Sequence, residues 1–437
     1  MALVGSGGGR KRRDGPFLTG LVATRYSSSN MRLTCPKDLS VSVASFYLRL
    51  SGFWLATSRR EQLLRNATIL YTIIILIFFL WLQMRGLYFS LEDFVACIFI
   101  ICNSVGLVLN LTKIIIVFIH KRKFLNLIAY MQNNFWHSNY DQNEHEIIAD
   151  AKYMCIYFVC VFAFFSQCTV FSYMITPILE NIGKNESERV LIFNMWLDLP
   201  LSISPYFEIA YAIQALSLYH TGVCYLCFDN IFCIMCLHVG GQFRVLQYRI
   251  SKMSRQQKKR NFDEHEDPYT SEKCYAIFKN CIEQHQTLIE FCDTMEVIFR
   301  EIAMDQVIIF SILICFIGYQ LVSVNLSVSY KTAFVSFLLC TMCQLWMFTY
   351  SCDFVTQESA NVGSAIYTIP WTDFPMDKHG KMLRKDCQLL IMRTRRACCL
   401  TACGFFPISL DTYTKIMSTA MSYFTILKQN SVNAVDT

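Results

Sequence analysis

Charged side chains are scarce in this chain of 437 residues, because Asp, Glu, Lys and Arg together make up only 16% of it. A soluble protein usually carries about 25%. The deficit comes from long, continuous apolar runs, and 54% of all residues are hydrophobic. Such runs are typical of membrane-spanning helices, since a backbone within hydrocarbon must satisfy its own hydrogen bonds. The composition therefore predicts an all-α, polytopic membrane protein.

Motifs of catalytic, metal-binding and nucleic-acid-binding sites are also missing. The sequence contains no HExxH, GxSxG or Walker A motif, and no aromatic-basic module for nucleic acid. Cys224 with Cys227, and Cys233 with Cys236, have the spacing of paired metal ligands, but their position on one continuous apolar run favours helix packing. We therefore expect no enzymatic activity, no cofactor, no bound metal and no nucleic-acid partner.

Seven apolar runs are candidates to cross the bilayer. They lie near residues 67–84, 94–120, 153–177, 199–223, 304–326, 331–351 and 412–428. The fourth run stays apolar as far as Gly241, so two spans are conceivable there, but no polar loop divides it and we expect one helix that continues beyond the bilayer. Before the first run, residues 42–55 form an amphipathic stretch that is too short to cross and is expected at the membrane interface.

Lys and Arg are divided unevenly between the loops. Alternate loops carry most of them, in groups at 59–65, 121–123, 244–300 and 378–396. By the positive-inside rule these loops face the cytoplasm, which places the N-terminus inside and the C-terminus outside. This topology is inverted relative to a G-protein-coupled receptor. The sequon Asn185-Glu-Ser187 then falls in an outer loop, so Asn185 is a candidate for glycosylation.

The last apolar run keeps an unusual number of polar side chains. On a helix, Lys415, Thr419, Ser422, Ile426 and Gln429 share one face, because they are spaced by four, three, four and three residues. A polar stripe on a spanning helix avoids lipid, so it either bonds another helix or lines water. A pore would require several subunits around an axis, with apolar Ile426 as a hydrophobic constriction. The residues alone favour neither interpretation.

The C-terminal third resembles insect odorant receptors. The resemblance rests on ESANVGSAIYTIPW at 358–371, LLIMRTRRACCLTACGFF at 389–406, and ISLDTYTKIMSTAMSYFTIL at 408–427. Near the N-terminus, the GFW of residues 52–54 is similar to the family's Gly-x-Trp. Ala397, where Pro is frequent, and Pro370, directly before Trp371, are small departures from the pattern.

This resemblance implies a tetrameric, ligand-gated cation channel whose pore is lined by the last helix of each subunit. It assigns the pore-lining positions to Thr419, Ser422, Ile426 and Gln429, with Ile426 as the gate. It also implies a cytoplasmic helical anchor. At the cytoplasmic end of the sixth span, we expect Asp353 and Glu358 to pair with the basic cluster at 393–396. The expected segments are a disordered cytoplasmic tail (1–40), six spans with a ligand-binding bundle (41–351), the anchor segment (352–411), the pore-lining helix (412–429) and an extracellular tail (430–437).

The implied partners follow from the same resemblance. The stretch 244–293 lacks the long insertion of the shared co-receptor, so the chain is interpreted as a tuning subunit that acts with the odorant receptor co-receptor in the plasma membrane of the olfactory neuron dendrite. Monovalent and divalent cations would pass the pore, and membrane lipid would surround it. G-protein-coupled and gustatory-type chemoreceptors are the alternatives. The loop charges and the absence of Asn-Pro-x-x-Tyr oppose the first, and the 358–371 block opposes the second.

A small apolar odorant requires an enclosed, aromatic-lined pocket with few polar groups. In the family this pocket lies in the outer half of the bundle, among spans two, three, four and six. The resemblance therefore suggests the following candidates: Ile98, Cys102, Cys168, Phe171, Ser172, Tyr206, Ala210, Phe334, Phe337, Leu338 and Thr341.

Overall fold

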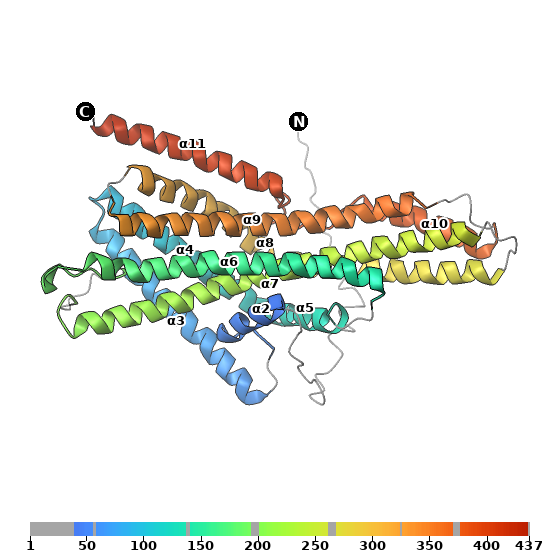
Figure 1. Ribbon diagram of the computed structural model, residues 1–437, viewed down its shortest axis with the longest axis horizontal. Helices are drawn as coiled ribbons and strands as arrows, with labels where there is room; N and C mark the ends of the chain where they lie inside the picture. Colours follow the sequence, from blue (N-terminus) through green and yellow to red (C-terminus); the bar gives the residue numbers. More distant parts are fainter. Residues whose placement is uncertain are drawn as a thin grey trace, which may run out of the picture. The chain divides into compact units, whose positions relative to one another are not determined.

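The computed structural model describes residues 39–55, 58–136, 140–193, 201–260, 268–323, 326–369 and 376–435 (Figure 1). Of the predicted tail 1–40, only the last two residues fall within these ranges, and Pro370 and Trp371 lie outside them. The helices are α2 (Leu39–Leu50), α3 (Arg59–Phe89), α4 (Phe94–Ile119), α5 (Lys121–Asn134), α6 (Gln142–Glu180), the 3-10 helix η1 (Glu186–Glu188), α7 (Tyr206–Arg260), α8 (Pro268–Ser323), α9 (Val328–Tyr367), α10 (Lys378–Thr394) and α11 (Leu410–Val435). Within the described ranges, β-structure is limited to one isolated bridge between Thr401 and Pro407.

Six of these helices, α3, α4, α6, α7, α8 and α9, are long and apolar enough to cross a membrane. This confirms the all-α membrane fold predicted from composition. The seventh candidate, α11, has 26 residues. Its length of about 39 Å exceeds the hydrocarbon thickness of about 30 Å, although polar residues interrupt its apolar character.

Polar side chains fix where several helices begin. Ser58 accepts a hydrogen bond from the Glu61 backbone N–H at the start of α3, and Asp93 accepts from two backbone N–H groups at the start of α4. Asp141 and Glu144 form a capping box at the start of α6. These residues satisfy backbone donors that a helix start leaves without a partner, so the loops between the apolar runs end at defined positions.

The central helix of the described structure is α7. It is one helix of 55 residues, which confirms that the fourth apolar run is undivided, but it begins at Tyr206, directly after Pro205, and not near residue 199 as predicted. Every residue from 226 to 243 is buried, because α7 packs against α6 and α9 (Figure 1) and also against α2 and α8. Neighbours on several sides explain why the sequence stays apolar beyond the length of one span.

Beyond the apolar spans, ion pairs join the extensions of these helices. Arg249 of α7 lies 2.7 Å from Glu144 of α6, and Arg244 lies 2.8 Å from Glu358 of α9. The expected pairing of Glu358 with the basic cluster at 393–396 is therefore wrong. The reason is that α7 extends along α9, which places Arg244 and Gln247 against this carboxylate.

The last helix contacts the bundle along a narrow edge. Its buried residues are Thr412, Ile416 and Ala420, and it packs mainly against α8 and also against α9. A short connection precedes it, held by a hydrogen bond from the Thr401 backbone N–H to the Glu296 carboxylate of α8, 2.9 Å long. Among the described residues, the remaining faces of α11 are thus left largely uncovered.

Candidate functional site

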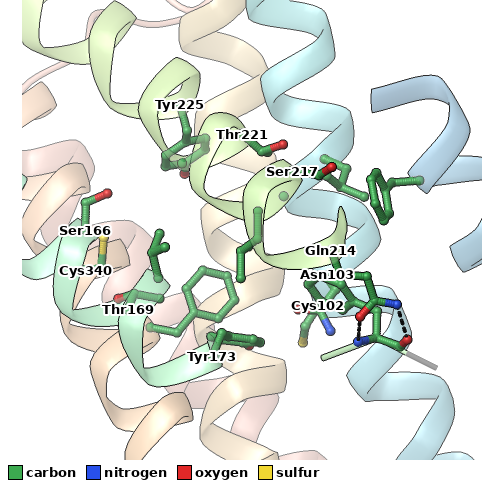
Figure 2. A pocket seen from close by; sticks show the side chains of 18 of the residues that line it. Cys102, Asn103, Ser166, Thr169, Tyr173, Gln214, Ser217, Thr221, Tyr225 and Cys340 are labelled. Atoms are coloured by element: carbon green, nitrogen blue, oxygen red, sulfur yellow. Dashed lines mark hydrogen bonds between the residues drawn. The ribbon is translucent and has the colours of Figure 1, made fainter. Parts of the chain in front are cut away.

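A cavity of about 150 Å³ lies between α4, α6, α7, α8 and α9, with α3 on one side (Figure 2). Its wall is mostly apolar and includes two glycines, one on α4 and one on α7. A cavity of this size holds a molecule about as large as benzene. The lining residues are Phe79, Gln83, Cys102, Asn103, Gly106, Leu107, Ser166, Thr169, Val170, Tyr173, Phe193, Gln214, Ser217, Leu218, Thr221, Gly222, Tyr225, Leu313, Phe337 and Cys340.

Several polar groups in this wall are already bonded within the protein. The Thr169 hydroxyl donates to the carbonyl oxygens of Phe165 and Ser336, at 2.9 and 3.0 Å. The Gln214 side chain accepts from the Phe193 backbone N–H at 3.0 Å and donates to its carbonyl at 2.9 Å. The Thr169 bond to Ser336 joins α6 to α9. The Gln214 bonds join α7 to Phe193, which precedes it in the chain. These bonds build the wall, and they commit the Thr169 hydroxyl and the Gln214 amide to partners within the protein.

Tyr173 of α6 is different. Its hydroxyl oxygen is buried and has no hydrogen-bond partner in the described part of the chain. Figure 2 shows its ring directed toward Cys102 of α4. Most buried polar groups in proteins are paired, so a buried hydroxyl without a partner beside a cavity needs an explanation.

A charged network lies next to the cavity. Lys113 of α4 donates to Asp229 of α7 at 2.7 Å, and both side chains are almost completely buried, with exposed fractions of 0% and 3%. The amide of Gln306 on α8 donates to the other carboxylate oxygen at 2.8 Å, and the amide of Gln344 on α9 donates to the oxygen that Lys113 binds. The Lys113 ammonium also lies 4.5 Å from the ring centre of Tyr225, a wall residue. The network therefore joins four helices beside the cavity.

The structure distributes the predicted ligand-binding residues over several environments. Cys102 and Phe337 line the cavity, and Phe334 lines a smaller neighbouring one. Three others, Ile98, Ala210 and Thr341, are buried in helix contacts outside the cavity wall. Phe171 and Tyr206 are 50% and 51% exposed, and the remaining candidates are partly buried without lining this space: Cys168, Ser172 and Leu338.

Sequence reasoning missed Tyr173, Thr169, Gln214 and Tyr225 as wall residues. On α6, the cavity face carries Ser166, Thr169, Val170 and Tyr173, whereas the predicted face is rotated by about one residue. For the network there was a signal, since an ionisable residue such as Lys113 within an apolar run is a functional candidate by default.

The predicted pore-lining residues lie away from the buried edge of α11. Thr419, Ser422, Ile426 and Gln429 are all exposed in the single chain, Ile426 by 54%. The hydroxyls of Thr419 and Ser422 donate to backbone carbonyls one turn earlier, at 2.8 and 3.0 Å. Lys415 pairs with Asp411 at 2.6 Å at the start of the helix. The glycosylation candidate Asn185 is exposed beside η1.

Comparison with known proteins identifies the family. The profile of the 7tm Odorant receptor family matches residues 90–421. Odorant receptor 13a of Drosophila melanogaster is similar at 23% identity over 412 residues, covering 90% of this chain and 96% of that receptor. Odorant receptor Or2 of Anopheles gambiae is similar at 20% identity over 226 residues, covering 52% of this chain and 57% of that receptor.

The solved structures agree in fold. The insect olfactory receptor OR5 from Machilis hrabei in complex with eugenol aligns with a TM-score of 0.74 at 15% identity, covering 89% of this chain and 97% of that one. Because the family profile covers well over half of the sequence, this multi-pass membrane protein belongs to the 7tm Odorant receptor family and is a receptor, not an enzyme.

Proposed function

We propose that this receptor binds a small, mainly apolar odorant in the cavity and, together with the odorant receptor co-receptor, gates a non-selective cation channel in the plasma membrane of the olfactory neuron dendrite. The observation that carries the proposal is one packed cluster that reaches from the cavity to α11. It contains the wall residues Cys102 and Leu313 and the buried α11 residues Ile416 and Ala420. Tight packing transmits a volume change at one end of such a cluster to the other.

The path from the cavity to α11 runs along α8. Leu313 faces the cavity, and five residues later a Cβ on Gly318 would lie 3.5 Å from the ring of Phe424. This is an ordinary van der Waals distance, so the Phe424 ring packs directly against α8 at this position. A ligand that displaces Leu313 therefore acts on the helix that holds α11 in place. This supports ligand control of α11 without a direct contact between the two.

The exposed stripe of α11 supports the pore. Polar side chains at Thr419, Ser422 and Gln429 are unfavourable against lipid, and the helices that the structure describes leave them exposed. Partner subunits around an axis would turn this stripe toward water. We assign the shared co-receptor as that partner, since the chain lacks the co-receptor's long insertion between α7 and α8.

Whole-cell current in cells that express the receptor with the co-receptor tests the pore, with G-protein signalling blocked. Replacing Ile426 by Thr is expected to raise the current without ligand several-fold, because a polar side chain lets water enter an apolar constriction. Met421 is similarly exposed at 56% but lies on another face, so Met421→Ala serves as the control and is expected to leave selectivity and basal current unchanged. Odour responses that vanish under the blockade would contradict the channel and support metabotropic signalling.

Gly106 offers a separate test of the cavity. A Cβ at this α4 position has no heavy atom within 4 Å, because it points into open space in the cavity wall. Gly106→Ala is therefore expected to stabilise α4 by about 0.5–1 kcal/mol. Gly106→Val fills more of the cavity and is expected to weaken responses to the largest active odorants at least tenfold, while responses to the smallest persist. Concentration–response curves and surface biotinylation measure the two effects. Equal losses for large and small odorants would contradict this position for the ligand.

A further inference from the structure

We infer that the cavity selects neutral, benzene-sized ligands that carry one hydrogen-bond acceptor, and that the Tyr173 hydroxyl donates to this acceptor. This inference rests on the proposed function, because it takes the cavity to be the ligand site. It adds the chemical class of the ligand and the residue that recognises its polar group. Size, charge and hydrogen bonding each contribute to it.

Size limits the ligand first. A cavity of about 150 Å³ is small compared with sites for drug-sized molecules, which occupy about 300–1,000 Å³. An apolar cavity of similar volume holds benzene. Aromatic side chains such as Phe79 and Phe337 contribute to the wall. A single six-membered ring with a short substituent therefore fits, whereas a long chain or a fused ring system requires the wall to move.

Charge limits the ligand next. The cavity wall contains no Asp, Glu, Lys, Arg or His among the residues that the structure describes. Lys113, which lies 4.5 Å from the ring centre of the wall residue Tyr225, is bonded to Asp229, and Asp229 also accepts from two amides. An ionised ligand would lose its hydration without gaining a counter-charge, which is strongly unfavourable. Carboxylates and ammonium compounds are therefore excluded.

Hydrogen bonding then favours one type of polar group. The Tyr173 hydroxyl is buried and unpaired within the described ranges, while the wall groups of Thr169 and Gln214 are committed to backbone atoms. A phenol hydroxyl is a good hydrogen-bond donor, so a ligand oxygen that accepts from it would supply the missing partner. The ring of Tyr173 extends from α6 toward Cys102 (Figure 2), and both residues line the cavity, so in this inference a ligand held between the two helices accepts from the hydroxyl. Aldehydes, ketones, esters and ethers provide the required acceptor.

Two pairs of isosteric probes test this recognition. Benzaldehyde and styrene differ by a carbonyl oxygen in place of a methylene carbon, as do acetophenone and α-methylstyrene. Wild-type receptor with co-receptor is expected to respond to each carbonyl compound at a roughly threefold to tenfold lower concentration than to its hydrocarbon partner, the effect of one neutral hydrogen bond. Tyr173→Phe removes only the hydroxyl, and it is expected to abolish this difference while leaving the hydrocarbon responses unchanged.

Ser217→Ala is the matched control, because it also removes one hydroxyl from the wall, on α7. It is expected to preserve the difference within each pair. A difference that survives Tyr173→Phe, or one that disappears in Ser217→Ala, overturns the assignment. Benzoate or benzylammonium acting as well as benzaldehyde overturns the exclusion of charge.

Thermal stability of the purified receptor–co-receptor complex separates this inference from the channel proposal, since a ligand that binds the folded state raises the melting temperature. Stabilisation by benzaldehyde that depends on Tyr173, without any current, leaves the recognition intact and contradicts the channel. Absence of both stabilisation and current for all four probes contradicts the ligand class itself.

Discussion

Replacing Asp229 by Asn is expected to remove most of the folded receptor from the cell surface, with a loss of about 3–5 kcal/mol in the free energy of unfolding. Asn has nearly the same size, so the effect arises from charge. The Lys113 ammonium, 2.7 Å from the Asp229 carboxylate and without exposed surface, would stay buried after losing its bonded counter-charge. Surface biotinylation and the melting temperature of the purified complex measure the loss.

A double variant isolates the pairing. Lys113→Met alone is expected to lower the free energy of unfolding by a similar amount, because the Asp229 carboxylate then stays buried with only amide donors. Lys113→Met combined with Asp229→Asn removes both charges and is expected to restore most of the stability, as found when buried ion pairs are neutralised together. Additive losses in the double variant would contradict a specific interaction between the two residues.

An exposed ion pair provides the comparison. Arg300 and Glu301 lie 3.8 Å apart, and each side chain is 49% exposed. Glu301→Gln is expected to change the free energy of unfolding by less than about 1 kcal/mol, since solvent screens such pairs. If Glu301→Gln and Asp229→Asn reduce surface expression equally, burial of the Lys113–Asp229 pair does not explain the effect of Asp229→Asn.

The fold was largely predictable because length and apolar composition are local properties of each run. The undivided α7 is an example, since a helix boundary needs a polar or helix-breaking segment and the sequence offers none between 206 and 241. The start of α7 was misplaced because residues 199–205 are also apolar enough to extend a span, whereas Pro205 lacks a backbone N–H and is better placed at a helix start.

The cavity was less predictable because hydropathy does not fix helix rotation within a bilayer. Lipid and protein core are both apolar, so α6 shows no strong polar face to orient it. A rotation by one residue exchanges Ser172 for Tyr173 at the cavity. Phe171 illustrates the result, because it is as suitable for a ligand pocket as Phe337 by residue type, yet it is half exposed on the outer surface.

Pairing between side chains on distant helices was the feature that the sequence predicted least well. Lys113 and Asp229 are 116 residues apart, and each is a single charge in an apolar run. Sequence physics shows that each needs a partner, but several opposite charges are available along the chain. The choice is made by the crossing of α4, α7, α8 and α9, which also brings Gln306 and Gln344 to the same carboxylate. The Glu358 partner was misassigned for the same reason.

Replacing Gly52 by Ala is expected to destabilise the receptor by about 3 kcal/mol or more. Gly52 ends α2 with a φ of +83°, and the Gly52 and Phe53 backbone N–H groups donate to the carbonyls of Arg49 and Leu48 at 3.2 and 2.8 Å. This is the Schellman arrangement, in which a left-handed residue terminates the helix. A Cβ at Gly52 would also lie 2.5 Å from the backbone oxygen of Arg65 in α3, so the two helices would have to separate.

Gly183→Ala separates the two causes of this loss. Gly183 has nearly the same φ, +80°, but a Cβ there has no heavy atom within 4 Å. The Gly183→Ala variant is therefore expected to lose only the energy of backbone strain at a left-handed Ala, about 1–2 kcal/mol. The difference between the variants, read from the melting temperature of the complex, is the contribution of the contact between Gly52 and α3. Equal shifts would mean that α3 moves away from Gly52 at no cost. Phe53 and Trp54, which are buried directly after Gly52, argue against this, because that movement would open the core they fill.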